Sequence, residues 1–385
     1  MTLTFFSNYM NHHQRPLCDA LYERLGAGFC FVATEDMSEE RRKMGYDDPA
    51  NNRPYVIKTY DPENAQKNRE LALRLANESD VVILGDAPAS YIEQRLRENK
   101  ITFRYNERFF KEGKWRILNP RIFLFYRKYH TAYRKKNLYM LCASAYTAPD
   151  CRLIRSYPGK TYRWGYFPPV KQYDNVEDLL ELKRRSGASI LWTSRFIEWK
   201  HPEDPIQVAK RLKSEGYSFE LNMIGSGELE GKIKAMIERE GLTDCVHLLG
   251  TMPPEEVRRH MEKADIFLFT SDRNEGWGAV LNESMNSACA VVASREIGSA
   301  PYLIRDGENG LLYNRKRKDD LYRKVRSLLD QPERRKALQI NAYETMLKKW
   351  NANIAAERLL HLIDCLQKGV DAGYADGPCS KDENC

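Results

Sequence analysis

The chain lacks any apolar run long enough to cross a bilayer. Its apolar runs, such as Val81–Leu84 and Ile266–Phe269, fall far short of the roughly 18–20 residues that a crossing requires. No basic segment precedes the first apolar residues, so Leu3–Tyr9 is predicted to be a first strand rather than a signal peptide. We therefore expect a cytoplasmic protein, with peripheral contact with the cytoplasmic face of the inner membrane as an open alternative.

The nine cysteines form no Cys-x-x-Cys pair and no Asp-x-Asp sequence occurs, so neither a disulfide framework nor a metal site is predicted. The net charge of +7, from 61 basic and 54 acidic residues, fits anionic ligands but is too moderate for a nucleic-acid-binding protein. What the sequence does contain is a hydrophobic fraction of 42%, enough for packed cores, and a length of 385 residues, which suits two domains.

Two series of short apolar runs follow each other, one from Leu3 to Phe167 and the other from Ile190 to Tyr313. Each series alternates with helical patterns, which is typical of parallel sheets with crossover helices. The predicted fold class is therefore α/β with two Rossmann-like domains, and Pro168 and Pro169 mark the hinge between them. The expected organisation is an N-terminal domain at 1–168, a C-terminal domain at 169–340, a helix at 341–368 that packs back toward the N-domain, and a disordered tail at 369–385.

Ligands of open α/β sheets bind at the carboxyl ends of strands, so the loops after the strands of the second series are the first place to search. Arg195 and Lys200 lie five residues apart on the loop that follows the first of these strands. Two cations in that position could clamp a diphosphate. The alternative is a pair of solvated surface charges.

A second loop of this kind runs from Asp272 into a predicted helix. Gly276 and Gly278 would let the backbone adopt positive φ and approach a ligand closely. Glu275 precedes the helix and Glu283 lies inside it, so one carboxylate could meet a hexose while the other reaches ribose hydroxyls. The alternative is ordinary N-terminal helix charge together with a surface glutamate.

Taken together, these motifs resemble the C-terminal domain of retaining GT-B-type glycosyltransferases of the large "group 1" family, a glycosyltransferase family 4-like pattern. The resemblance covers about residues 188–330. It rests on the order Arg195-x4-Lys200, Gly225-Ser-Gly227, Leu249-Gly-Thr-Met252, Ala264–Ser271, Glu275-x7-Glu283, Ala290–Ser294 and Asp306-Gly-Glu-Asn-Gly310. This sequence departs from the family pattern at Trp277, where Phe is commoner, and at Asn286–Cys289, where an Ala-x-Gly turn is usual.

The resemblance implies a GT-B architecture, with two Rossmann-like domains that face each other across a cleft. It implies that the C-domain binds a nucleotide-diphosphate sugar, and the N-domain an acceptor. In this reading Arg195 and Lys200 hold the donor diphosphate, Glu275 contacts the sugar and Glu283 the ribose. Further donor contacts are expected from the main chain and neighbours at Gly225, Thr251, Met252, Gly276, Trp277 and Gly278.

The N-terminal half matches the family less sharply. Asn11, His12 and His13 follow the first strand, where a contact with donor or acceptor competes with simple exposure. The family's usual histidine after the fifth strand is missing, and this chain has Glu107 and Arg108 there. Glu107 could accept the acceptor's proton, or could form a structural salt bridge with Arg108.

Residues 119–137 alternate aromatic and basic side chains at helical spacing. Ile122, Tyr126, Tyr129 and Tyr133 are predicted on one face, and Arg127, Lys128, Arg134 and Lys135 on another. Such a helix could rest on anionic lipid or grip a lipid-diphosphate acceptor. A packed crossover helix with a solvated basic side is the equal alternative.

The function expected from the resemblance is transfer of a sugar, with retention, to the hydroxyl of a saccharide or lipid-linked saccharide in cell-surface polysaccharide or glycolipid synthesis. Attack would be front-side, with the leaving diphosphate assisting deprotonation, closure about the hinge excluding water, and neither a cofactor nor a metal. The rival hypotheses are a sugar-nucleotide epimerase or phosphorylase of the same fold, and a non-catalytic sugar-nucleotide-binding subunit.

Overall fold

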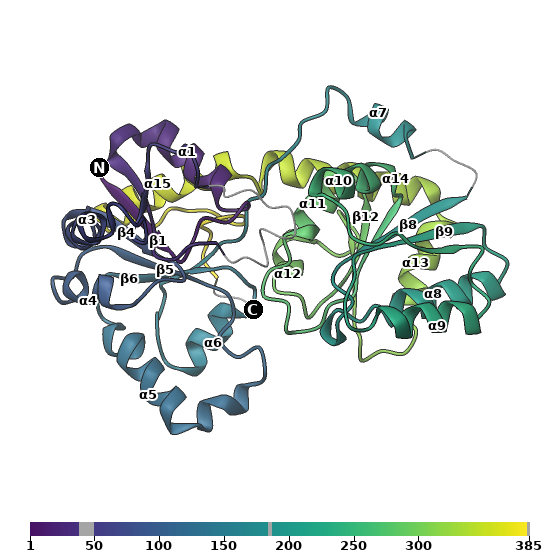
Figure 1. The fold of residues 1–385 in the computed structure, drawn as a ribbon, viewed down its shortest axis with the longest axis horizontal. Helices are drawn as coiled ribbons and strands as arrows, with labels where there is room; N and C mark the ends of the chain where they lie inside the picture. The colour runs from purple at the N-terminus through teal and green to yellow at the C-terminus, as the bar shows by residue number, and fades with distance from the viewer. Residues whose placement is uncertain (38–49, 184–186, 383–385) are drawn as a thin grey trace. The chain divides into compact units, whose positions relative to one another are not determined.

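A computed structural model describes residues 1–37, 50–183 and 187–382. The chain divides into two compact units, each of which is described by itself. Unit 1 consists of Met1–Pro169 and Asn351–Cys385, and unit 2 consists of Val170–Trp350. Each unit is built around its own parallel sheet (Figure 1).

The described part of unit 1 contains a seven-stranded sheet in the order β3-β2-β1-β4-β5-β6-β7. All of its strand pairs are parallel. Its strands are β1 Leu3–Ser7, β2 Phe29–Ala33, β3 Val56–Lys58, β4 Val81–Leu84, β5 Thr102–Asn106, β6 Leu138–Cys142 and β7 Thr161–Arg163. Its helices are α1 Arg15–Leu25, α3 Ala65–Glu78, α4 Ser90–Arg97, α5 Pro120–Tyr129, α6 Thr147–Leu153 and α15 Ala352–Lys368, with 3₁₀ turns η1 Gly26–Gly28, η2 Lys114–Leu118 and η3 Thr131–Tyr133.

Strands β4 and β6 at the centre of this sheet are continuous apolar runs, as expected where helices cover both faces. Every residue of β1, β4 and β6 is buried. Helices α3, α4 and α6 supply small and branched side chains to a core that includes Phe6, Val82 and Met140. Helices α1 and α15 pack against each other on the opposite face, although they come from opposite ends of the chain (Figure 1).

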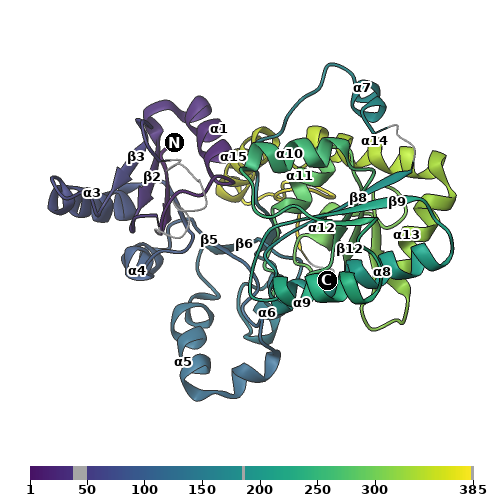
Figure 2. The same cartoon turned by 45° about the vertical axis from the view of Figure 1, so that its right-hand side comes forward.

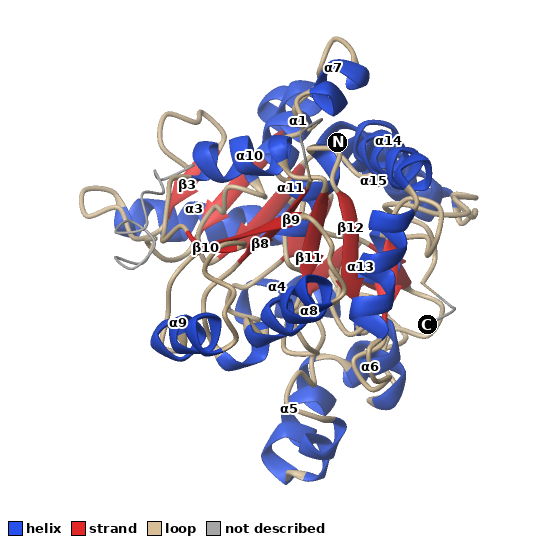
Figure 3. Ribbon diagram, turned by 90° about the vertical axis from the view of Figure 1, so that its right-hand side faces the viewer, coloured by secondary structure: helices blue, strands red, loops and turns tan. Residues whose placement is uncertain are grey.

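The described part of unit 2 contains a six-stranded parallel sheet in the order β10-β9-β8-β11-β12-β13. Helices α8, α9 and α13 pack around a core on one face of the sheet, and α10, α11 and α14 lie on the other face (Figure 3). Its strands are β8 Ala188–Thr193, β9 Phe219–Ile224, β10 Val246–Leu248, β11 Ile266–Phe269, β12 Ala290–Ser294 and β13 Leu311–Tyr313. Its helices are α7 Val176–Glu181, α8 Glu203–Ser214, α9 Glu230–Arg239, α10 Pro254–Lys263, α11 Val280–Asn286, α12 Ala300–Leu303, α13 Asp320–Asp330 and α14 Pro332–Lys348, with a 3₁₀ turn η4 Glu198–Lys200.

The two sheets share one topology. Counted along each unit, the strands run 3-2-1-4-5-6, with a seventh strand added to unit 1. This is the Rossmann order, in which the chain leaves the first strand toward one edge of the sheet and later returns to build the other. The predicted α/β class with two Rossmann-like domains is confirmed.

The C-terminal part of the chain differs from the sequence expectation in two ways. Helix α14 continues to Lys348, so the chain leaves unit 2 after Trp350 and not near residue 340. The tail was expected to be disordered, yet the Asp382 amide donates to Thr161 O at 3.0 Å, and Lys381 pairs antiparallel with Tyr162. Cys379, Ser380 and Asp382 are buried, because this short segment covers the open edge at β7. Residues 383–385 lie outside the described residues.

The predicted amphipathic helix over 119–137 is only partly formed. Asn119 accepts a hydrogen bond from the Arg121 amide, and Pro120 occupies the first turn, which starts α5. The helix ends at Tyr129, and the 3₁₀ turn η3 follows. Tyr133, Arg134 and Lys135 therefore do not share a helical face with α5. Along the described residues, no helix combines the length and the apolar character that spanning a bilayer requires.

Candidate active site

The carboxyl ends of the strands of unit 2 carry the candidate site. Strands β8 and β11 are neighbours, but the chain leaves them toward opposite edges of the sheet, which makes this the topological switch point. Backbone hydrogen bonds join the two loops here, since the Asp272 amide donates to Trp199 O at 3.0 Å. The loops that contain Lys200 and Glu275 are thus held side by side.

At this edge of the sheet, Gly225 lies in close contact with the loop after β8 and is hydrogen-bonded to the loop after β10. It has φ 129°, and a Cβ atom built there would lie 1.9 Å from Ser194 O, so only glycine fits. The Gly225 amide donates to Gly250 O at 2.8 Å, which fixes the loop that leads to Thr251 and Met252. Thr251 is exposed and Met252 is half-buried. Both are therefore accessible for the predicted main-chain contact with a ligand.

A buried ion pair lies at the centre of this edge. Lys200 is 9% exposed and donates to the Glu275 carboxylate, which also accepts a hydrogen bond from Ser271 Oγ at 2.9 Å. The Lys200 ammonium lies 4.2 Å from the ring centroid of Trp199. Two predicted site residues are therefore brought together, and the alternative that made Lys200 a solvated surface charge is wrong.

Arg195 behaves differently from Lys200. It is exposed, and among the described residues it has no ion-pair partner. The Phe196 amide beside it donates to Ser226 O at 2.8 Å, so the backbone that carries Arg195 is anchored to the loop of Gly225 and Gly227. The structure thus offers one free cation and one paired cation at the predicted diphosphate clamp.

The glycine-rich segment before α11 corrects two expectations. Of Gly276 and Gly278 only Gly278 has a positive φ, at 82°, and a Cβ there would lie 2.4 Å from the Phe269 ring. The Trp277 side chain is fully buried, donates to Asn282 at 2.9 Å and packs against Tyr302 and Trp350. Its indole belongs to the core, because Tyr302 of α12 and Trp350, which follows α14, pack against it, so a donor contact of Trp277 cannot come from the indole.

Glu283 lies in the first turns of α11 and is half-buried. Burial raises the pKa of its carboxyl, and the positive charge of Arg258 opposes that shift. Arg258 itself is bound to the C-terminal end of α11 through Glu283 O, Asn286 and Ser287. A carboxyl in this setting is suited to hydrogen bonding with hydroxyl groups rather than to ion pairing.

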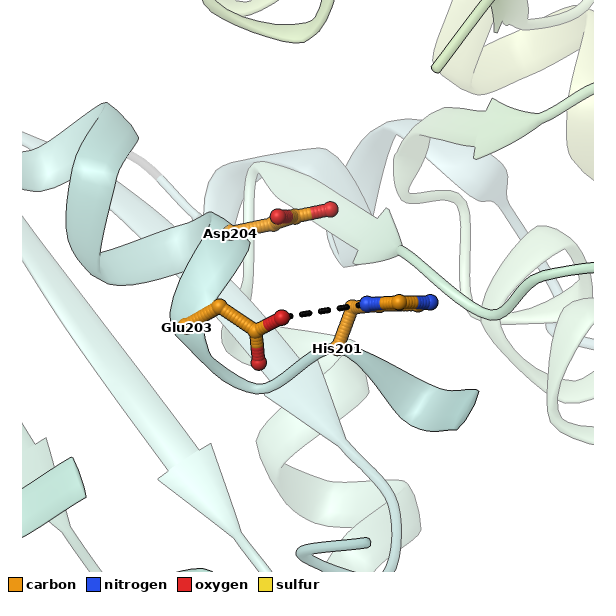
Figure 4. A group of neighbouring side chains, drawn as sticks. All are labelled: His201, Glu203 and Asp204. Carbon is orange, nitrogen blue, oxygen red and sulfur yellow. Dashed lines mark hydrogen bonds and ion pairs between the residues drawn. The ribbon is translucent and has the colours of Figure 1, made fainter. Parts of the chain in front are cut away.

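A cluster that the sequence search missed lies next to Lys200. His201, Glu203 and Asp204 each offer a ligand atom, and these atoms lie within 4.8 Å of one another (Figure 4). Arg315 occupies the Asp204 carboxylate at 2.5 Å. Burial lowers the pKa of His201 but its hydrogen bond to Glu203 raises it, and the net shift is upward. The raised pKa of His201 and the pairing of Asp204 with Arg315 favour an ion-pair network over a metal site.

Unit 1 joins two of its predicted site residues through a tyrosine. The buried His13 ring stacks on Tyr166, with ring centroids 3.8 Å apart. The Tyr166 hydroxyl donates to Glu107 at 2.6 Å, and Lys111 binds the other oxygen of the same carboxylate at 2.5 Å. The alternative that paired Glu107 with Arg108 is wrong, because Glu107 is paired with Lys111. Arg108 is directed toward Asp150, at 4.0 Å, and stacks over the Tyr146 ring.

Asn11 and His12 adjoin this group. The Asn11 amide donates to Gln14 at 2.9 Å, which shapes the turn into α1, and the His12 ring lies 5.1 Å from that of His13. Sequence reasoning missed a further contact, in which Asn8 donates to Asp86 at 2.9 Å. These two residues follow β1 and β4, the strands at the switch point of unit 1, so strand order would have been the signal.

Comparison with known proteins finds a family match in the C-terminal half. Residues 181–345 match the family model described as glycosyl transferases group 1. The chain is 38% identical over 128 residues to the amylovoran biosynthesis glycosyltransferase AmsK of Erwinia amylovora, covering 32% of this chain and 31% of AmsK. It is 30% identical over 175 residues to a Campylobacter jejuni transferase named for N-acetylgalactosamine transfer onto a diphospho-undecaprenol saccharide, covering 45% of this chain and 46% of that protein. The chain thus spans less than half the length of these relatives.

Solved structures show the fold over nearly the whole chain. HepE of Anabaena, solved in complex with UDP, superposes with a TM-score of 0.66 at 13% identity, covering 94% of this chain and 100% of HepE. WaaG, described as a glycosyltransferase involved in lipopolysaccharide biosynthesis, superposes with a TM-score of 0.59 at 15% identity and covers 94% of this chain. The architecture is therefore GT-B.

Proposed function

We propose that this protein is a retaining glycosyltransferase that moves a sugar from a nucleotide-diphosphate donor to a hydroxyl acceptor. The observation that carries the proposal is the buried pair of Lys200 and Glu275, held at the switch point of the unit that matches the group 1 family. Ligands of such sheets bind at that edge. Relatives named for exopolysaccharide and lipid-linked saccharide synthesis support a saccharide acceptor.

Each group has a distinct part in the proposed reaction. Arg195 is the exposed cation for the donor diphosphate, Lys200 orients Glu275 toward the sugar, and Glu283 holds the ribose hydroxyls. The bond from the anomeric carbon to the diphosphate breaks as the bond to the acceptor oxygen forms on the same face. The acceptor's proton passes to the leaving diphosphate. Positive charge at that position stabilises the developing negative charge.

Unit 1 is the proposed acceptor domain. The group formed by His13, Tyr166 and Glu107 is the candidate surface for acceptor hydroxyls. Tyr166 and Lys111 both hold the Glu107 carboxylate, so its two oxygens are fixed in direction. A fixed carboxylate can orient an acceptor hydroxyl, or take its proton as a second route beside the leaving diphosphate.

The function is tested by incubating the full chain with radiolabelled nucleotide sugars and a membrane extract that supplies acceptors. Label that moves from the donor into a saccharide of unchanged anomeric configuration supports transfer with retention. Three results would contradict the proposal. Isomerised donor would indicate an epimerase, phosphate-dependent cleavage of an oligosaccharide a phosphorylase, and binding without turnover a non-catalytic subunit.

The two carboxylates supply an internal control for this test. Glu283→Ala should weaken the affinity for free nucleotide diphosphate, whereas Glu275→Gln should slow sugar transfer with little change in that affinity, because the two groups face different parts of the donor. Calorimetry with the nucleotide diphosphate and initial rates with the labelled donor measure the two effects. Equal losses of nucleotide affinity in both variants would contradict the assignment of sugar and ribose.

Metal removal gives a further prediction. Donor binding and turnover should survive excess EDTA, since side-chain cations and not a divalent ion neutralise the diphosphate. His201→Ala serves as a matched variant, because it removes one ligand of the group in Figure 4 and leaves Arg195 in place. A loss of turnover in EDTA that magnesium restores would contradict this prediction.

A further inference from the structure

An exposed apolar surface lies on η2 and α5 of unit 1. The described part of the chain exposes ten large hydrophobic side chains, and half of them lie within residues 115–125. We call these five the α5 surface. Leu118 is 81% exposed, and its companions are Trp115, Phe123, Leu124 and Phe125.

Helix α5 is held in place by its other face. Tyr126 packs against the rings of Phe109 and Phe110, with centroid distances of 5.1 Å and 5.3 Å, and the helix ends beside the buried His130. The three views in Figure 1, Figure 2 and Figure 3 show α5 projecting beyond the sheet of its own unit. The apolar residues at 123–125 are thus presented to solvent by an anchored helix and not by a frayed loop.

The same segment is the most basic part of the chain. Residues 111–136 contain nine Lys or Arg and a single acidic residue, so their surplus of eight exceeds the net charge of +7 of the whole chain. On α5 the exposed cations Arg121, Arg127 and Lys128 alternate with the exposed apolar residues. Aromatic and aliphatic side chains interleaved with cations are typical of helices that lie in the interface of an anionic bilayer.

A hollow beside α5 adds a second feature. It has a volume of about 300 Å³ and is lined by Phe109, Phe110, Ile122, Phe125 and Tyr126. Arg121 and Arg116, which also pairs with the exposed Glu112 at 2.7 Å, line the same hollow. Arginine binds phosphate oxygens in a bidentate manner, so a phosphate at these two residues would leave an attached acyl chain close to the apolar lining.

From this arrangement we propose that the α5 surface docks the protein onto the headgroup layer of an anionic phospholipid membrane, with Arg116 and Arg121 binding a lipid phosphate. The charge of the segment selects an anionic bilayer over an apolar protein partner or a second copy of the chain. The proposal does not depend on the glycosyltransferase activity, because neither the five residues of the α5 surface nor Arg116 and Arg121 belong to the proposed donor or acceptor groups.

The test is co-sedimentation of the full chain with two kinds of vesicle, one of phosphatidylcholine and one of an equal mixture of phosphatidylcholine and phosphatidylglycerol. Binding is expected only to the mixed vesicles and should fall as salt is raised. Phe123→Ser with Leu124→Ser should weaken binding by roughly tenfold or more, and Arg127→Gln with Lys128→Gln should do the same. Arg116→Gln with Arg121→Gln should weaken binding by a similar factor.

Matched controls come from α3 of the same unit. Leu73 is 51% exposed there, and Lys67 and Arg74 are exposed, so Leu73→Ser and the double change Lys67→Gln with Arg74→Gln should bind as the parent does. Thermal unfolding confirms that each variant is folded. Equal binding to both vesicles, parental binding by all the α5 variants, or a dimer in solution that Phe123→Ser dissolves would overturn the proposal.

Discussion

Replacing Lys200 by alanine is expected to destabilise unit 2 by about 3–5 kcal/mol, the cost of removing one partner of a buried ion pair. The side chains of Lys200 and Glu275 are only 11% and 10% exposed. Without the ammonium, the Glu275 carboxylate would stay buried, with the Ser271 hydroxyl still donating a hydrogen bond to it. Urea unfolding of the full chain, followed by hydrogen exchange in β8 and β11, measures the loss.

Two variants separate this effect from a general weakness of the loop. Lys200→Met combined with Glu275→Gln removes both charges, so it should lose clearly less stability than Lys200→Ala alone. Arg195→Ala, five residues away on the same loop but exposed, should stay within about 0.5 kcal/mol of the parent. If Lys200→Ala unfolds at the parental urea concentration, the pair does not contribute to folding.

The contrast between Arg195 and Lys200 separates what the sequence could predict, the position of the site, from what it could not, the burial of each cation. Strand positions and the switch point follow from local apolar runs and from the regular order of βα units, so the edge of the sheet that carries the site could be predicted. Which cation is buried depends on the packing of Trp199 and Phe269 around the Lys200 ammonium. Nothing in the spacing of the two cations encodes that packing.

The predictions for Trp277 and for the tail were wrong because both depend on contacts with residues that are distant in sequence. The Trp277 indole is buried by Tyr302 and Trp350, which are distant in sequence, so its place in a glycine-rich motif gave the wrong environment. The tail is polar and rich in glycine, yet backbone pairing with β7 orders it. Main-chain hydrogen bonds do not depend on side-chain hydrophobicity, and composition therefore cannot reveal such pairing.

The helix predicted over 119–137 was wrong at its C-terminal end, because α5 ends at Tyr129. Its periodicity continues through Tyr133, but His130 turns inward to bond Tyr157 at 2.7 Å, and the helix stops before it. The exposed residues Phe123, Leu124 and Phe125 lie between the positions of the predicted aromatic face, so the periodicity did not single them out. Their importance appears only when the anchored face, through Tyr126, is known.

Arg195→Ala is the cleanest test of the proposed chemistry, because this side chain is exposed and its loss should leave folding intact. Negative charge grows on the diphosphate as the bond to the sugar breaks, so a fixed cation there stabilises the transition state more than the bound donor. Turnover at saturating donor should fall by roughly tenfold to a thousandfold, the range for losing one such group.

Two further variants complete this experiment, which follows kcat for transfer of labelled sugar. Arg195→Lys keeps the charge but not the planar fork, so it should recover part of the rate. Arg259→Ala removes an exposed arginine from α10 of the same unit and should transfer sugar at the parental rate. An Arg195→Ala protein that is folded and turns over at nearly the parental rate would remove Arg195 from the diphosphate site. The cation at the leaving group would then have to come from elsewhere, because Lys200 is already paired with Glu275.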